Sequence, residues 1–158
     1  MMVNWKVGAL LAPIGFLGVA LALTNARAEV GDSPAQLIAR YGAPEDASAL
    51  SLGVGDWKTP QAEIAAILEN NKTIIMSYRG VDEKTKDTFL KQNLPKGQTW
   101  VDGKDFRAFA RGRQGVAAGP GEQLWQTTDG KVWAAFNPER GILLVATPEG
   151  VKRFSFSQ

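Results

Sequence analysis

Cysteine and histidine are both absent from the 158 residues of this chain. The absence of cysteine excludes disulfide bonds, a thiol nucleophile and a lipid-modified cysteine. The absence of histidine excludes Ser-His-Asp triads, Cys-His dyads, imidazole zinc sites and histidine-ligated haem. We therefore predict no metal site and no cofactor, and we expect the hydrophobic core alone to stabilise the fold.

Glycine-rich loops that bind phosphate are missing as well. The Gly53-x-Gly55 pair has no third glycine and no following helical pattern, and residues 115–121 are not followed by Lys-Ser or Lys-Thr. The sequence therefore predicts no nucleotide cradle.

Carboxylates are the main groups left for acid–base catalysis, and carboxylates alone can hydrolyse glycosides. They occur in pairs near expected helix starts and turns, where acidic residues usually serve as caps or as solvated charge. We assign no catalytic residues, and a carboxylate-based hydrolase of an envelope polymer is the alternative function. The pairs are Glu45/Asp46, Asp82/Glu83 and Asp102/Asp105.

Positive and negative charges balance once the N-terminal segment is set aside. The whole chain has 18 basic and 16 acidic residues, but Lys6 and Arg27 lie within residues 1–28, which contain no acidic residue. Nucleic-acid binding depends on a basic face that neutralises phosphates. We therefore expect no nucleic-acid partner.

Residues 1–28 have the organisation of a secretory signal peptide. One lysine precedes an apolar run at residues 7–23, and a small-x-small cleavage site ends at Ala28. Proline and glycine interrupt the run, which favours cleavage, but its length also fits an uncleaved N-terminal membrane anchor. We expect an exported protein, periplasmic or extracellular, in which residues 29–158 form a single domain.

A short helix is predicted over residues 33–41. Ser33 is a typical N-cap, Pro34 suits the first helical position and Gln36 completes a capping box. Gly42 is expected to end the helix. The apolar face that should dock on a sheet consists of Leu37, Ile38 and Tyr41.

The pattern Gly31-x-Ser33-x-x-Gln36-Leu37-x-x-x-Tyr41-Gly42-x-Pro44 resembles the opening motif of the outer-membrane-assembly lipoprotein family (SmpA/OmlA, BamE). The resemblance covers residues 31–44. It implies an α+β fold like that family and the β-lactamase-inhibitor-protein group, in which short helices lie on an antiparallel sheet. It also implies a protein that acts by binding another protein.

The chain between the first helix and residue 78 is ambiguous. Residues 47–58 are expected to form an irregular connection that includes Trp57. Residues 60–68 fit a helix by spacing, but they also fit a hairpin with residues 73–78 through an Asn70-Asn71 turn, and we favour the hairpin. Its register would pair Glu69 with Lys72, Ile67 with Ile74 and Ala66 with Ile75.

A second helix is predicted over residues 82–93, opened by acidic residues and followed by Pro95 and Gly97. Its helical spacing separates a buried edge from a solvated one. The buried edge is Phe89, Leu90 and Leu94, and the solvated residues are Lys84, Lys86, Lys91 and Gln92.

Residues 104–121 are expected to form a long irregular loop after a short strand at residues 98–101. Loops of this length are often functional. Its aromatic and basic side chains are candidate contacts for a protein partner, although the phenylalanines would also serve to anchor the loop to the core. The candidates in this segment are Phe106, Arg107, Arg111 and Arg113.

Residues 124–156 contain short apolar runs separated by Gly and Pro, which predicts a β-meander. An Asp129-Gly130 pair suits a type I′ hairpin turn, and that turn would place Gln126 opposite Trp133. Residues 142–147 are apolar at nearly every position, as in a central strand. The predicted fold class is therefore α+β, with short helices packed on an antiparallel sheet.

The same register places the two tryptophans of this hairpin on opposite faces. Trp125 shares a face with aliphatic residues and is expected in the core. Trp133 shares a face with Gln126 and Lys131, so we expect it to be exposed and count it as a further candidate partner contact, unless a helix or the long loop covers it.

These observations favour an exported, non-catalytic binding or assembly module of the cell envelope, with an unidentified envelope protein as its partner. The membrane would be contacted only through the N-terminal segment, if that segment is retained.

Export with removal of residues 1–28 can be tested by intact-mass measurement. The exported protein should have the mass of a chain that starts at Glu29, because the small-x-small site ends at Ala28. A mass that includes Met1 would instead identify the segment as a membrane anchor.

Overall fold

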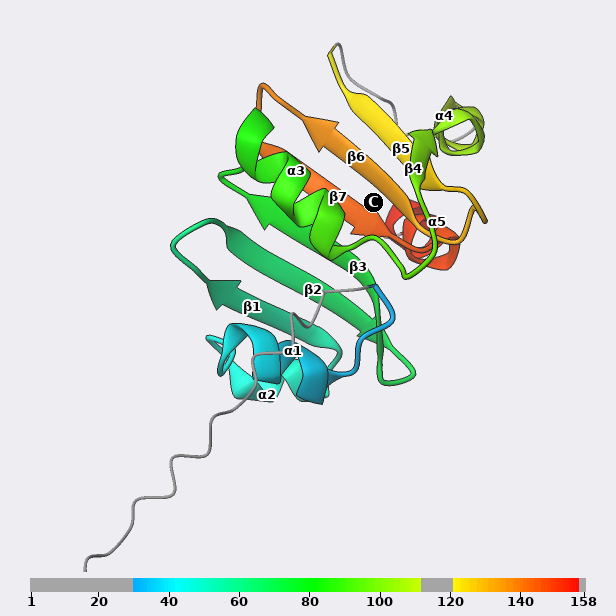
Figure 1. The fold of residues 1–158 in the computed structure, drawn as a ribbon. Helices are drawn as coiled ribbons and strands as arrows, with labels where there is room; N and C mark the ends of the chain where they lie inside the picture. Colours follow the sequence, from blue (N-terminus) through cyan, green and yellow to red (C-terminus); the bar gives the residue numbers. More distant parts are fainter. Residues whose placement is uncertain (1–29, 112–120, 157–158) are drawn as a thin grey trace, which may run out of the picture.

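The computed structural model describes residues 30–111 and 121–156, so the expected signal segment at residues 1–28 lies outside the described part. The described chain forms one antiparallel sheet with helices on both sides (Figure 1). The predicted α+β class is therefore confirmed.

The sheet has seven strands, in the order β1-β2-β3-β7-β6-β5-β4. The strands are β1 Val54–Lys58, β2 Glu63–Glu69, β3 Lys72–Arg79, β4 Trp100–Asp102, β5 Gln123–Thr127, β6 Trp133–Asn137 and β7 Ile142–Ala146. The helices of the described part are α1 Pro34–Tyr41, α2 Ala47–Ser51, α3 Glu83–Gln92, α4 Lys104–Arg111 and α5 Pro148–Phe156. As predicted, β7 is central, between β3 and β6.

The first face of the sheet carries the larger core. Leu37 of α1 and Phe89 of α3 pack there with Trp57, Tyr78 and Phe136 of the strands. Figure 1 shows α3 lying across the middle of the sheet and α1 beside β1 and β2. These helices cover the first face along most of its width.

The second face carries a smaller core, which is formed by side chains under α4 and α5. Phe106 of α4 and Val151 of α5 pack with Ile75, Trp133 and Ala146. Helix α4 lies on β5, whereas α5 lies on β3 and β7. On β2 the contacts reach Ile67, which packs at the margin of the second core, and Glu69, which pairs with Arg153 of α5. The rest of this face over β1 and β2 lies outside the main helix contacts of the described part.

Helix α1 begins and ends as the sequence predicts. The Ser33 side chain accepts from the Gln36 amide, the Gln36 side chain accepts from the Ser33 amide, and Gly42 has φ 84°. Leu37 is fully buried, but Ile38 is 41% exposed, so its assignment to the buried face is wrong. Leu37 therefore holds the helix on the sheet with the half-buried Tyr41.

Helix α3 also lies at the predicted position, with a capping box between Asp82 and Thr85. Lys86, which we expected in water, is buried at 7% exposure. Its Nζ lies 5.4 Å from the centre of the Trp125 ring and hydrogen-bonds Gln123 of β5. Spacing within the helix cannot reveal this contact, because the aromatic partner comes from another strand.

Residues 47–58 are not irregular, contrary to expectation. They form α2 and the edge strand β1, with the Asp46 side chain capping α2. Trp57 is 2% exposed, and its Nε1 donates to the carbonyl of Gly42. The alternation of exposed and buried residues in β1 is short and includes a glycine, so the sequence alone does not indicate a strand here.

The favoured β2–β3 hairpin is confirmed, with Asn70 and Asn71 at positive φ in the turn. Glu69 pairs with Lys72 as predicted. Beyond that pair the register shifts by one residue, so Ile67 lies opposite Ile75 and Ala66 opposite Met76. The predicted pairs of Ile67 with Ile74 and Ala66 with Ile75 are therefore wrong, because Ile74 is an extra, bulged residue.

The first part of the expected loop at residues 104–121 is a helix, α4, and residues 112–120 lie outside the described part. Phe106 of α4 is 2% exposed and stacks on Trp133 with ring centres 4.9 Å apart. Trp133 is itself 7% exposed, so the expectation of an exposed Trp133 is wrong. Trp125 is half-buried at the margin of the first core.

The β5–β6 connection has the predicted register but a different turn. Gln126 faces Trp133, yet only Gly130 has positive φ and Thr127 is hydrogen-bonded to Val132, which gives a four-residue loop. The Asp129 carboxylate accepts from the Thr127 hydroxyl and the Lys131 amide, and these bonds lower the pKa of Asp129. A two-residue and a four-residue loop centred on the same residues give the same pairing of β5 with β6, so the predicted register is correct although the predicted turn is not.

The last apolar run is a helix and not a strand of the meander. Helix α5 begins at Pro148, and Gly150 lies so close to β3 that an added Cβ would be 2.3 Å from the Ile74 carbonyl oxygen. Glycine allows this approach. The meander therefore ends with β7.

The stacked pair of Trp133 and Phe106 gives a direct test of the second core. Trp133→Ala should lower the free energy of unfolding by about 3–5 kcal/mol, because it removes a large buried ring. Trp125→Ala should cost less, because Trp125 is only half-buried. Denaturant melts would contradict this packing if the Trp133 variant were the more stable of the two.

Candidate functional site

One region of the second face stands out because the helices of the described part reach only its margin, where Leu144 packs against the second core. We call this region the open face, and its side chains alternate with buried residues of the first core along β1, β2, β3 and β7. The charged residues are exposed, whereas the small and apolar ones are half-buried. The open face consists of Asp56, Lys58, Glu63, Ala65, Ser77, Arg79, Ile142 and Leu144.

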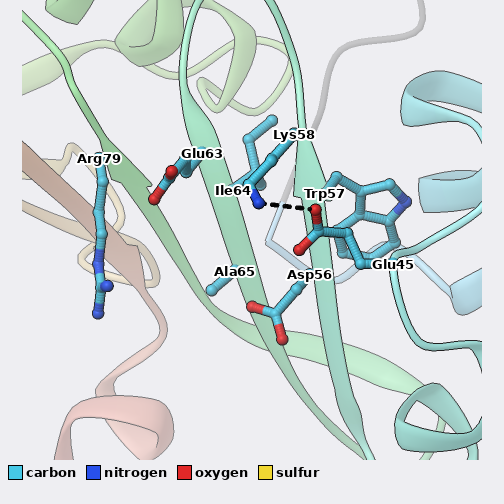
Figure 2. A pocket seen from close by; sticks show the side chains of 8 residues that line it. All are labelled: Glu45, Asp56, Trp57, Lys58, Glu63, Ile64, Ala65 and Arg79. Atoms are coloured by element: carbon cyan, nitrogen blue, oxygen red, sulfur yellow. Dashed lines mark ion pairs between the residues drawn. The ribbon is translucent and has the colours of Figure 1, made fainter.

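Three of these residues form a row of alternating charge, which we call the charged ladder. Lys58 of β1 lies directly opposite Glu63 of β2, and Glu63 lies opposite Arg79 of β3. Figure 2 shows Lys58, Glu63 and Arg79 in this order across the three strands. Neighbouring strands are about 4.8 Å apart, so the two cations flank one anion within about 10 Å.

The row continues into apolar surface on the far side of Arg79. Its next neighbour is Ile142 of β7, and Leu144 follows on the same face of that strand. Both are half-buried. Arg79 is exposed, and within the described residues its guanidinium has no ion-pair partner, so its donors are available to a ligand.

A shallow depression of about 130 Å³ lies at the β1 end of the ladder. Glu45, from the turn before α2, reaches over the strand edge and pairs with Lys58 at 3.1 Å (Figure 2). The hydrogen bond and charge of Glu45, followed by the charge of Glu63, raise the pKa of Lys58. The Glu45 amide also donates to the Asp56 carbonyl, so this turn covers the free edge of β1.

The side chains that line this depression are mostly charged and exposed to water. Three carboxylates line it, those of Glu45, Asp56 and Glu63, together with Lys58 and Arg79. The Glu45 and Lys58 side chains are 50% and 67% exposed. A general acid or base usually depends on burial that shifts its pKa toward neutrality, and side chains this exposed remain in water. The arrangement suits recognition of a charged surface better than proton transfer.

The sequence-predicted contact residues do not meet at this surface. Phe106 and Trp133 lie together inside the second core, and Arg107 pairs with Asp102 at 3.4 Å. Arg111 is the last residue of α4, and Arg113 lies outside the described residues. Two of the five candidates are therefore buried packing residues.

The sequence gives little sign of the open face. With the hairpin register expected from the Asn70-Asn71 turn, Glu63 would lie opposite Tyr78, and only the bulge at Ile74 brings it opposite Arg79. The alternation of charged residues in β1 and β2 could have indicated an exposed strand face. The glycine in β1 interrupts that pattern and makes it hard to recognise.

A second hollow lies at the opposite end of β1 and β2. Pro34, Leu50, Leu68 and the Asn70-Asn71 turn line it together with Leu52, whose side chain is 83% exposed. This hollow is less charged than the open face. It provides a comparison surface for binding experiments.

No protein-family model, curated protein or solved structure matches this chain. The resemblance of residues 31–44 to the outer-membrane-assembly lipoproteins thus stays a hypothesis, and the local capping around Ser33 and Gly42 is sufficient to produce the same pattern.

Two further searches of the described residues were negative. Residues 30–111 and 121–156 contain no helix that is both long and apolar enough to cross a bilayer. The same residues contain no group of three or more acidic side chains placed to hold a metal ion.

We expect the charged ladder to affect stability mainly because residues opposite each other on neighbouring strands carry opposite charges. Glu63→Lys places three cations in one row and should lower the melting temperature by a few degrees, because like charges directly opposite each other repel. Reversing all four groups, with Glu45→Lys, Lys58→Glu, Glu63→Lys and Arg79→Glu, restores every pair and should recover most of the loss. Thermal melts in which the fourfold variant is the less stable one would contradict the ladder.

Proposed function

We propose that this protein is an exported, non-catalytic binding module of the cell envelope, and that its open face contacts a protein partner. One observation carries the proposal: the sheet is covered by helices on its first face and on part of its second, but its β1–β3 region bears exposed charges that adjoin half-buried apolar residues of β7. A surface that combines polar side chains with apolar area is the usual composition of a protein–protein interface.

The location of arginine supports this assignment. Arg79 is exposed, lies near the middle of the open face and has Ile142 as its neighbour. Arginine is enriched among residues whose truncation weakens protein complexes, particularly near apolar contacts that exclude water. Arg79 is therefore the residue that we expect to contribute most to binding.

Export is compatible with the contacts made by residues that follow the expected cleavage site. Val30 packs at the margin of the first core, and the Asp32 carbonyl accepts from the Thr73 amide. Val30 and Asp32, which follow the expected cleavage site at Ala28, are thus part of the folded domain. Balanced charge in residues 29–158 favours a protein partner over nucleic acid.

A carboxylate-based hydrolase is the second candidate, because Glu45, Asp56 and Glu63 line one depression. In that case Glu63→Gln would abolish hydrolysis of an envelope polymer while leaving binding in place. The water-exposed setting of these side chains makes this candidate the weaker of the two.

Site-specific photo-crosslinking in the native envelope tests the binding function. A photoreactive residue at Ser77, in the centre of the open face, should yield a defined cross-linked protein, and one at Lys84, on the exposed side of α3, should not. Adding Arg79→Glu should reduce the Ser77 product by at least about tenfold, which is the size of effect expected for a central interface arginine.

The control variant is Leu52→Ser in the second hollow, which should leave the Ser77 product unchanged. Loss of the product with Leu52→Ser but not with Arg79→Glu would move the interface to the opposite end of β1 and β2 and overturn the assignment of the open face.

A further inference from the structure

The open face carries a charge order that restricts the chemistry of its partner. Along the ladder the sequence of groups is base, acid, base and then an apolar residue, contributed by Lys58, Glu63, Arg79 and Ile142. We propose that this row binds a helix of the partner that presents acid, base and acid on successive turns of one face. The inference rests on the binding function proposed above and specifies its partner chemistry.

The spacing of the ladder matches a helix better than an extended segment. Two steps across the sheet, from Lys58 to Arg79, cover about 10 Å. Residues i and i+7 of a helix share a face and are about 10.5 Å apart, with i+3 or i+4 between them. In an extended strand, side chains on one face are about 6.7 Å apart, so a third residue would fall about 13 Å from the first and miss the row.

The surroundings of the row also suit a helix. Elsewhere on the sheet, helices pack on apolar side chains of the strands, with α3 on the first face and α4 and α5 on the second. One row below the ladder, the half-buried Ala65 and Leu144 alternate with Asp56 and Ser77, and Leu144 continues the apolar surface at the margin of the second core. An incoming helix would then place an apolar side chain over Leu144 and Ile142.

The pairs within the ladder leave room for intermolecular ones. Within the described residues Glu63 and Arg79 have no side-chain hydrogen bond or ion pair, and the Lys58–Glu45 pair is exposed. Exposed pairs of this kind are weak and exchange readily, so a partner carboxylate can compete for Lys58 and can bind the Arg79 fork through two hydrogen bonds.

Two synthetic helical peptides of about 20 residues provide the probe, since this length forms a helix in water when alanine-rich. One carries Glu, Lys and Glu at positions i, i+4 and i+7, followed by Leu at i+11. The other has every charge reversed. Each is titrated into the exported protein at low salt, and binding is followed by backbone-amide NMR shifts.

The wild-type protein should bind the acid–base–acid peptide at least about tenfold more tightly than its reversed form, with shifts centred on Glu63, Ser77 and Arg79. The fourfold charge-reversed variant described above should show the opposite preference. Added salt should reduce both preferences, because the groups are exposed.

Equal binding of the two peptides, or no binding of either at millimolar concentration, would overturn the proposed charge code. If the Ser77 cross-link were still sensitive to Arg79→Glu, the binding function would stand and only the helical acid–base–acid chemistry would be rejected. Absence of that cross-link as well would reject both proposals.

Discussion

The β-bulge at Ile74 is the constraint on which the arrangement of this sheet depends. It inserts one residue into β3, so Leu68 pairs with Thr73 while Ile67 pairs with Ile75. On one side of the bulge, the Thr73 amide and hydroxyl both donate to the Asp32 carbonyl, which fixes the segment before α1 on β3. On the other side, every residue of β3 up to Arg79 changes its partner in β2 by one position, and a shift of one residue exchanges the two faces.

The bulge also decides which part of the second face is covered. The Ile74 carbonyl accepts from the Thr147 amide and abuts Gly150, so α5 begins directly over this point and lies along the near ends of β3 and β7. The far ends of the strands, with Glu63 and Arg79, then extend beyond the helix. The same irregularity therefore docks α5, brings Glu63 opposite Arg79 and leaves the ladder uncovered.

Local signals were sufficient to predict part of this structure. Capping by Ser33 and Asp82, the positive-φ asparagines at 70 and 71 and the centre of the β5–β6 loop all involve groups within four residues of one another. The bulge was hidden because residues 74–76 are all apolar, so their alternation has no visible phase. The burial of Lys86 and Trp133 depends on aromatic partners far along the chain, which no local spacing can reveal.

The order of charges on the open face bears on its purpose. A sheet region that stays uncovered must resist association with other sheets, and exposed charge of either sign achieves this. A row of lysines would serve equally well for that purpose, but it would be destabilised by repulsion between opposite residues. Alternating signs remove this repulsion and leave a directional pattern that ends at Ile142. Protection from aggregation therefore accounts for the presence of charge on this surface but not for its order. The alternation of signs, an Arg79 without an ion-pair partner in the described part of the chain, and the adjoining apolar residues are the features that the proposed binding function would use.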